Sequence, residues 1–384
     1  MRPGWQTKRL GDVATLQRGF DLPTQDRVSG DFPLVSSSGI SDTHHESAVR
    51  GPGVVTGRSG SIGNVFFIKE DFWPLNTVLY VKEFHGNDPK FVSYLLKQFD
   101  LRRFATGSGV PTLNRNFVHD ELVNVPSPRE QKRIVAILDE AFEGIETAVA
   151  NAEKNFACAR ELYDNYLNSA FRQSGQEAVN TTLGTVCELQ NGFAFKSDLF
   201  KTEGIPVLRI SSIQNGEVCD NRPVFTSLTD YREDLSRYVV SHGDLLIAMS
   251  GATTGKVGFN NTGKEFLLNQ RVGNFRPGPK LNKRYLYYFL YTKSENHLAM
   301  SAGSAQQNLS TKQIKEIIIP LPTMVKQLHL VRNITAIDGR LALLKSSYER
   351  KIAALSILRQ AILGEAFSGR LSSTAAKSLP EAAE

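Results

Sequence analysis

Two long stretches of the chain place apolar or small residues at helical spacing, with polar residues between them. In the first stretch, residues 129–172, these positions are Leu138, Ala141, Ile145, Ala148, Ala152, Ala159, Leu162 and Tyr166. In the second, residues 323–367, they are Ile334, Ile337, Leu341, Leu344, Tyr348, Leu355, Leu358 and Ile362, with Lys351 as an interruption. A repeat of three and four residues predicts one apolar stripe along each helix, as in a coiled coil.

The rest of the chain has a different pattern. Short apolar runs such as 53–55 and 244–248 alternate with Gly, Asn and Ser, which predicts strands and loops. Short helices are expected at 90–98 and 283–291. We therefore predict two α+β domains, residues 1–128 and 173–322, each followed by a long helix, and a flexible polar tail at 368–384.

The sequence also repeats itself. Leu10-Gly11-Asp12-Val13 and Leu16-Gln17-Arg18-Gly19-Phe20 return as Leu183-Gly184-Thr185-Val186 and Leu189-Gln190-Asn191-Gly192-Phe193. Ser59-Gly60, Leu75-Asn76, Gly107-Ser108 and Val125-Pro126-Ser127-Pro128 return in the same order as Ser250-Gly251, Leu268-Asn269, Gly303-Ser304 and Ile319-Pro320-Leu321-Pro322. Matches in one order over both halves indicate a duplication.

The two long helices are expected to pack on each other. The first stripe is rich in Ala and the second in Leu and Ile, so small side chains face large ones. The first helix carries six Lys and Arg against eight Asp and Glu, and the second carries seven against three. A pseudo-two-fold relation between the halves makes the pair antiparallel. The alternative is a helical hairpin folded back on a single domain.

Composition adds modest limits. A formal charge of +6 and a pI near 9.1 suit a polyanionic partner but do not require one. No apolar run of about 18 residues occurs and the first residues do not resemble a signal peptide, which predicts a cytoplasmic protein without a membrane segment. Cys158, Cys187 and Cys219 form no C-x-x-C, which argues against a disulfide framework and a zinc ribbon.

The order of domain, P-x-P, long helix, repeated once, resembles the DNA specificity subunits of type I restriction-modification systems over essentially the whole chain. The supporting strings are Gly243 to Gly251 with Gly255-Lys256-Val257, Leu268-Asn269-Gln270, Asn308-Leu309-Ser310 and Ile317 to Pro322. The first half has the family's P-x-P-x-E-Q as Pro126, Pro128, Glu130 and Gln131. The second half departs from it, with Lys326 before Gln327.

This resemblance implies two target-recognition domains joined by two long antiparallel coiled-coil helices, with no catalytic site and no bound cofactor. Each domain would read one half of a split double-stranded DNA target. Two modification subunits, which bind S-adenosylmethionine and methylate adenine, would dock on the helices, and restriction and translocase subunits would join them.

Other chemistry is poorly supported by the residues. Gly251 to Lys256 has three residues between its glycines and Val257 after the lysine, so it departs from the P-loop pattern. His44 and His45, near Asp42 and Glu46, could suggest a metal, but a solvated loop explains them more simply. No Asn/Asp-Pro-Pro-aromatic string of an amino-methyltransferase occurs.

Polar residues of the repeated loops are the candidates for DNA contact, because they can bond base edges and phosphates. They are Arg58, Ser59, Asn64, Asn76, Ser108, Asn114, Arg115, Ser250, Thr253, Thr254, Lys256, Asn269, Gln270, Arg271, Ser304, Gln306, Gln307 and Asn308. Gln17 to Phe20 and Gln190 to Phe193 are left out, since a Gly-aromatic turn explains them as well. The competing functions are a helical scaffold without sequence-specific DNA binding, and an independent nuclease or NTPase.

Overall fold

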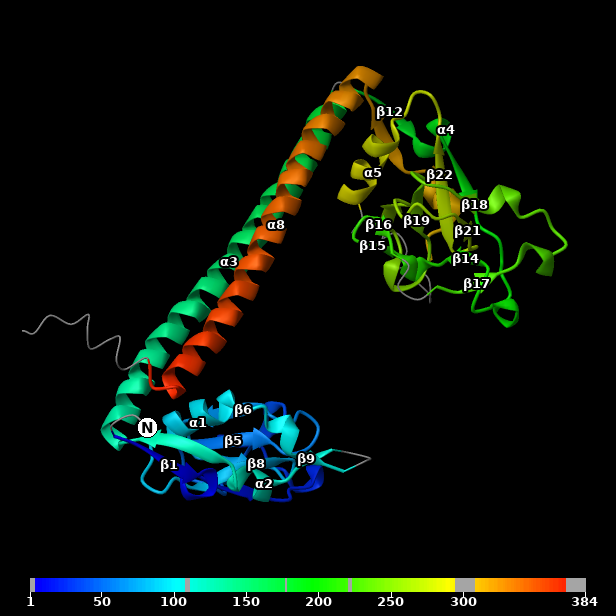
Figure 1. Ribbon diagram of the computed structural model, residues 1–384. Helices are drawn as coiled ribbons and strands as arrows, with labels where there is room; N and C mark the ends of the chain where they lie inside the picture. Colours follow the sequence, from blue (N-terminus) through cyan, green and yellow to red (C-terminus); the bar gives the residue numbers. More distant parts are fainter. Residues whose placement is uncertain (1–3, 108–110, 177, 220–222, 294–307, 371–384) are drawn as a thin grey trace, which may run out of the picture. The chain divides into compact units, whose positions relative to one another are not determined.

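The computed structural model describes residues 4–107, 111–176, 178–219, 223–293 and 308–370. The chain divides into two compact units, residues 1–153 with 348–384 and residues 154–347. Each unit holds one α+β domain and one part of each long helix, α3 (Pro128–Gln176) and α8 (Met324–Phe367) (Figure 1).

Unit 1 is built around an antiparallel sheet of order β2-β8-β5-β6, against which helix α1 packs. A second sheet of order β4-β3-β7 and the antiparallel pairs β1-β11 and β9-β10 complete it. Its elements are β1 (Trp5–Arg9), β2 (Thr15–Arg18), β3 (Phe32–Ser36), β4 (Gly39–His44), β5 (Gly53–Gly57), β6 (Val65–Ile68), β7 (Trp73–Pro74), β8 (Val78–Glu83), α1 (Pro89–Gln98), β9 (Ala105–Thr106), β10 (Thr112–Leu113), α2 (Arg115–His119) and β11 (Leu122–Pro126).

Unit 2 contains a sheet of order β13-β22-β19-β20-β16-β15, a sheet of order β17-β14-β21-β18, and the antiparallel pair β12-β23. Its elements are β12 (Val179–Thr182), α4 (Leu183–Val186), β13 (Cys187–Asn191), β14 (Ile205–Leu208), β15 (Ile213–Gln214), β16 (Glu217–Val218), β17 (Phe225–Thr226), β18 (Val239–Val240), β19 (Leu245–Ala248), β20 (Val257–Phe259), β21 (Phe266–Leu268), β22 (Val272–Pro277), α5 (Lys283–Thr292), α7 (Thr311–Lys315) and β23 (Ile318–Leu321).

The duplication is visible in the strand order. The first unit's β2-β8-β5-β6 corresponds to β13-β22-β19-β20 of the second, and β1-β11 corresponds to β12-β23. Two sequence matches need correction. Leu10 N donates to Glu121 O and Leu183 N donates to Ile317 O, both at 2.8 Å, so Pro126 corresponds to Pro322 and not to Pro320. Phe20 N donates to Pro74 O and Phe193 N donates to Leu268 O, both at 2.8 Å. Leu75 therefore corresponds to Asn269 and Asn76 to Gln270, one residue beyond the match drawn from the repeated Leu-Asn.

The long helices begin and end close to the expected places. Helix α3 covers Pro128–Gln176 where 129–172 was expected, and α8 covers Met324–Phe367 where 323–367 was expected. Within unit 1, Arg359 lies 3.4 Å from Glu146. Within unit 2, Tyr163 lies close enough to Asp338 for the two side chains to interact. From the first contact to the second, the residue number rises along α3 and falls along α8, so the two helices are antiparallel.

Two positions of the predicted stripes are wrong. Leu162 is 70% exposed, whereas Tyr163 beside it is 7% exposed and belongs to the core of unit 2. Leu358 is 47% exposed, and Arg359 takes its place, with its guanidinium 4.7 Å from the centre of the Phe142 ring. In both cases the residue after the leucine interacts with the opposite helix, so the predicted stripe is displaced by one position.

The helices belong to the cores of both domains. In unit 1, Ile134, Leu138 and Phe367 are buried with the domain's own apolar side chains. In unit 2, Phe171 and Ile334 are buried with Tyr285 and Phe289 of α5. These contacts contradict the alternative of a helical hairpin folded back on one domain, because each domain packs against both helices.

Each long helix is fixed to its domain by a fully buried glutamine. Gln131 Oε1 accepts a hydrogen bond from Asp88 N (2.9 Å), and its Nε2 donates to Pro126 O (3.0 Å). Gln327 makes the same contacts, with Asn282 N (2.8 Å) and Pro322 O (2.9 Å). Lys326 in place of the usual Glu therefore leaves this anchoring contact intact.

Candidate nucleic-acid interface

Three loops of the first domain meet through backbone hydrogen bonds. Arg58 N, after β5, donates to Thr77 O before β8 (2.9 Å), and Leu113 N in β10 donates to Arg58 O (2.8 Å). The segment around Arg58 thus lies between the loops that carry Asn76 and Asn114. Candidates from three distant parts of the sequence are brought to one place.

The second domain repeats this arrangement. Met249 N donates to Arg271 O (2.9 Å), and Leu309 N donates to Met249 O (2.8 Å). Ser250 and Asn308 pair as an isolated β-bridge, as Ser59 and Thr112 do in the first domain. Met249 therefore corresponds to Arg58, so the two domains differ in side chains at the same point of the fold.

The candidates differ in exposure. Asn64, Arg115, Lys256, Gln270, Arg271 and Asn308 are exposed. Arg58, Ser59, Asn76, Asn114, Thr253 and Asn269 are half-buried. Ser108, Ser304, Gln306 and Gln307 lie outside the described residues.

Several candidates have structural roles. Ser250 and Thr254 are buried, at 7% and 1% exposure, and Thr254 Oγ1 donates to Gly251 O (2.7 Å). Asn114 Oδ1 accepts a hydrogen bond from Asn116 N (3.0 Å) and caps α2. Asn269 Oδ1 accepts one from Arg271 N (3.2 Å) and shapes its turn. Buried side chains cannot contact a duplex without moving, so Ser250 and Thr254 take no part in the proposal below.

The segments Gln17 to Phe20 and Gln190 to Phe193 form Gly-aromatic turns that close the domains, which was one of the two interpretations of their sequence. A Cβ on Gly19 would lie 2.3 Å from Leu75 O, and one on Gly192 would lie 2.1 Å from Asn269 O. Only glycine permits such close approach of two backbone segments. Arg18, which precedes the first turn, nevertheless lies beside Asn76. In the sequence, the signal that marks Arg18 is its charge, which its counterpart Asn191 in the repeat lacks.

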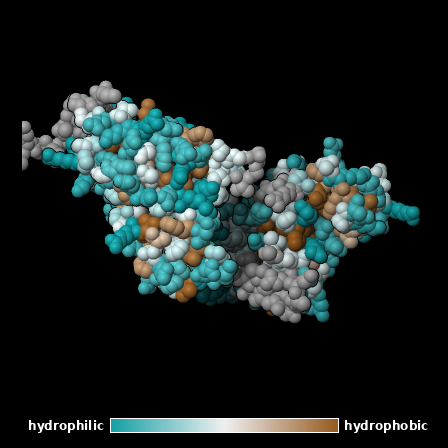
Figure 2. All heavy atoms as spheres, turned by 90° about the horizontal axis from the view of Figure 1, so that it is seen from below, coloured by the Kyte–Doolittle hydropathy of each residue, from teal (hydrophilic) through white to brown (hydrophobic). Residues whose placement is uncertain are grey.

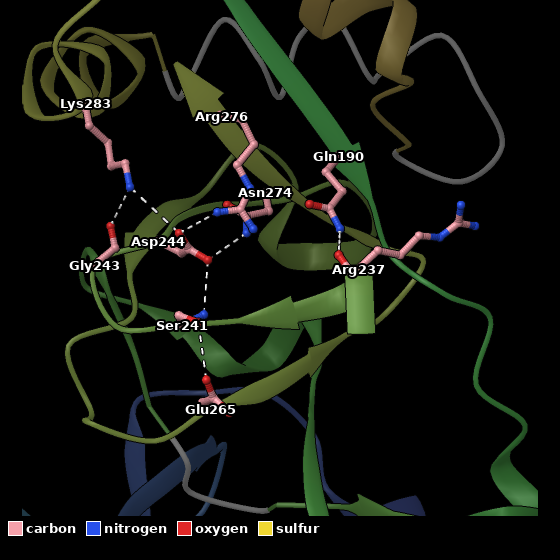
Figure 3. A network of polar contacts seen from close by, with 9 residues as sticks. All are labelled: Gln190, Arg237, Ser241, Gly243, Asp244, Glu265, Asn274, Arg276 and Lys283. Atoms are coloured by element: carbon pink, nitrogen blue, oxygen red, sulfur yellow. Dashed lines mark hydrogen bonds and ion pairs between the residues drawn. The ribbon is translucent and has the colours of Figure 1, made fainter. Parts of the chain in front are cut away.

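The second domain has a buried carboxylate at the end of its central strands (Figure 3). Asp244 Oδ2 accepts hydrogen bonds from Ser241 N (3.1 Å) and Asn274 Nδ2 (2.9 Å). Asp244 Oδ1 lies 2.9 Å from Arg276 Nη1 and 3.7 Å from Lys283 Nζ. With its charge balanced and its oxygens bonded, Asp244 joins β19, β22 and α5 and serves the domain's structure.

The described residues offer little support for a metal site or a nucleotide-binding loop. His44 is buried in β4, with its ring edge-on to Trp73 at 5.3 Å, so the prediction of a solvated loop was wrong for this residue. No group of three or more His, Cys, Asp or Glu side chains that could hold a metal occurs in the described parts of the chain. The loop at Gly251 forms a short 3-10 turn beside the meeting point of the second domain.

The cysteines are free thiols of different exposure: Cys158 is exposed, Cys219 is half-buried and Cys187 is buried. Burial raises the pKa of the Cys187 thiol to about 12. No helix in the described residues is both long and apolar enough to cross a membrane. In the view of Figure 2, hydrophilic side chains cover most of the surface and apolar ones form small groups among them.

Comparisons with known proteins agree with the duplicated architecture. The family model described as "Type I restriction modification DNA specificity domain" matches residues 3–153 and again residues 176–350. The specificity subunit of type I restriction enzyme MjaVIII from Methanocaldococcus jannaschii is 23% identical over 379 residues, which cover 90% of this chain and 89% of that protein. The EcoKI specificity subunit of Escherichia coli strain K12 is 26% identical over 279 residues, covering 65% of this chain and 58% of that protein.

Solved structures share the fold. A chain from a study of complex assembly and conformational transition of the type I R-M system has a TM-score of 0.75 at 21% identity, covering 96% of this chain and 99% of that one. The HsdS subunit from Thermoanaerobacter tengcongensis has a TM-score of 0.56 at 21% identity, covering 96% and 98%. The two matched domains and the shared fold establish that this chain belongs to the type I restriction-modification DNA specificity family, as a non-catalytic specificity subunit.

Proposed function

We propose that each domain of this specificity subunit reads one half of a split double-stranded DNA target through its three meeting loops. The observation that carries the proposal is that both domains bring the same three segments together but furnish them with different polar side chains. Equivalent positions with different donors and acceptors are what two different half-sites require.

The exposed side chains of these loops suit such a role. Arg115 with Asn64 in the first domain, and Lys256 with Arg271 in the second, offer cationic and amide groups to solvent. Lysine and arginine side chains bind DNA phosphates with an affinity that falls as the salt concentration rises. The guanidinium of arginine and side-chain amides can also form paired hydrogen bonds with base edges. The DNA is therefore expected to bind in a salt-dependent manner at both sets of loops.

The long helices are proposed to hold the partner subunits. Leu343 and Ile357 of α8 and Leu162 of α3 present apolar side chains to solvent, with exposures of 72%, 70% and 70%. We propose two modification subunits as the occupants, with S-adenosylmethionine and adenine methylation on those subunits. Restriction and translocase subunits would join that complex, in the cytoplasm.

The test is selection of DNA by the full chain. We expect the chain to enrich, from a randomised duplex library in excess unrelated competitor DNA, sequences with two specified clusters at fixed separation. Arg115→Ala should alter one cluster and Arg271→Ala the other. Lys132→Ala, which removes an exposed lysine of α3 outside both domains, should alter neither.

The outcome separates this function from the alternatives. Enrichment of no sequence over the input library would contradict sequence-specific binding and favour a helical scaffold. Hydrolysis of DNA or ATP by the purified chain would instead favour an independent enzyme.

A further inference from the structure

One carboxylate, Asp21, joins the end of β2 to one of the meeting loops of the first domain. Arg18 Nη2 donates to both oxygens of Asp21, at 3.0 and 3.1 Å. The amide Nδ2 of Asn76, from the loop before β8, donates to Asp21 Oδ1. Arg58 Nη1 in turn donates to Asn76 O (3.4 Å). Asp21 thus binds the guanidinium of Arg18 and the amide of Asn76, and Asn76 in turn contacts Arg58.

This cluster is exposed. The side chains of Arg18 and Asp21 are 49% and 61% accessible to solvent. An ion pair at such exposure contributes little to folding stability, because water screens the attraction and two side chains lose freedom. The stability of the domain therefore depends little on this ion pair, and the guanidinium of Arg18 is accessible from solvent.

The second domain lacks the cluster at the equivalent place. Asn191 stands where the first domain has Arg18, Ala194 where it has Asp21, and Met249 where it has Arg58. Asn191 Oδ1 instead accepts a hydrogen bond from Thr311 Oγ1 (2.9 Å). Backbone hydrogen bonds that hold this place recur in both domains, from Phe20 N to Pro74 O and from Phe193 N to Leu268 O, while the side chains differ.

We propose that Arg18 is a specificity-determining residue of the first domain, that it contacts a guanine of that domain's half-site, and that Asp21 positions it. This inference rests on the proposed function. Arginine can donate two hydrogen bonds to the O6 and N7 acceptors of guanine, a pattern that no other base edge offers in the major groove. The donors of Arg18 that do not bond Asp21 remain for that contact, and the carboxylate limits the orientations of the guanidinium.

The experiment compares variants of the full chain in selection from the randomised duplex library. Arg18→Lys keeps the charge and removes the forked donors. Asp21→Asn keeps the shape and removes the carboxylate charge. We expect Arg18→Lys to reduce the preference for guanine at one position of one half-site by roughly 10-fold or more. Asp21→Asn should reduce the preference at the same position by a smaller factor.

The double variant tests the positioning role. Because Asp21 acts through Arg18, adding Asp21→Asn to Arg18→Lys should cause little further loss at that position. An additive loss would overturn the positioning role. Arg9→Ala is the matched control, since Arg9 is an exposed arginine of the same domain whose partner, Asp120 at 3.2 Å, lies outside the cluster.

The other half-site serves as the internal control for folding and binding. Unchanged guanine preference in Arg18→Lys, with both half-sites intact, would overturn the inference alone. Failure of the unmodified chain to select any split sequence would overturn the proposed function. Loss of the whole first half-site, together with a lowered unfolding temperature in Arg18→Lys, would also overturn the inference, because it would assign Arg18 a structural role.

Discussion

At the scale of single residues, His119 shows how one side chain fixes a loop near the proposed interface. Its Nε2 accepts a hydrogen bond from Leu16 N at 2.8 Å, so the bond needs a neutral ring. Burial, with a smaller effect of Arg115, lowers the pKa of His119 below 6.5, and Asp120 opposes this. The equivalent position of the second domain, against Gly184, is Lys315.

Unit 1 is therefore expected to lose stability in mildly acidic solution. Above pH 6.5 the ring is neutral in both states and the contribution to stability is complete. As the pH falls below 6.5 towards the lower value of the folded state, the unfolded chain takes up the proton first, and the free energy of unfolding decreases. Chemical unfolding of the full chain over this pH range measures the effect.

The variant His119→Gln should flatten this pH dependence, because its amide oxygen can accept the bond and does not titrate. His45→Gln, at an exposed histidine of the same unit, is the control. An equal slope in the His119→Gln variant and the unmodified chain would show that another group is responsible.

At the scale of elements, the long helices show which side chains define the contact stripe. Tyr163 is 7% exposed and Leu162 is 70% exposed, although both fit an apolar spacing. Burial raises the pKa of the Tyr163 hydroxyl, and the nearby carboxylate of Asp338 on the opposite helix raises it further. The contact stripe of α3 therefore includes Tyr163 and excludes Leu162.

Substitution of these two neighbours should affect the free energy of unfolding to very different extents. Tyr163→Ala removes a buried aromatic side chain and leaves a cavity, and should lower the free energy of unfolding by about 3 kcal/mol. Leu162→Ala should change it by less than about 0.5 kcal/mol, as for most surface positions. Urea unfolding distinguishes them, and equal effects would mean that the stripe is assigned to the wrong face.

At the scale of the whole molecule, the proposed division of labour assigns base recognition to the domains and half-site separation to the helices. A seven-residue insertion after Ala148 in α3, with a matched insertion in α8, preserves the heptad pattern. Each helix gains roughly 10 Å at 1.5 Å per residue. We expect selection from the randomised library to lengthen the gap by about three base pairs, at ~3.4 Å each, and to leave both half-sites unchanged.

The control is the same seven-residue insertion made in α8 alone. It breaks the register between the two helices and should lower the unfolding temperature. If the double insertion alters the bases of either half-site, the helices do more than separate the domains.

Much of the architecture was readable from the sequence because it depends on local spacing and on internal repetition. The 3-4 pattern placed both long helices to within a few residues, and the repeated strings revealed the duplicated α+β domains. The family resemblance, confirmed by the match to both halves, supplied the function as a specificity subunit. Burial of Gln131 and Gln327 was not readable, since nothing in a polar residue's type says that its partners are backbone atoms far along the chain.

The tertiary structure decided what local spacing cannot encode. Whether Leu162 or Tyr163 faces inward depends on the opposite helix, and whether Asn76 matches Asn269 or Gln270 depends on strand pairing. It also separated Ser250 and Thr254, which are buried, from Arg115 and Lys256, which are exposed. The sequence by itself determined the helices, the duplication and the family. The meeting of Arg18, Asp21 and Asn76 is a tertiary fact, because exposure and contact arise only when segments distant in the chain pack together.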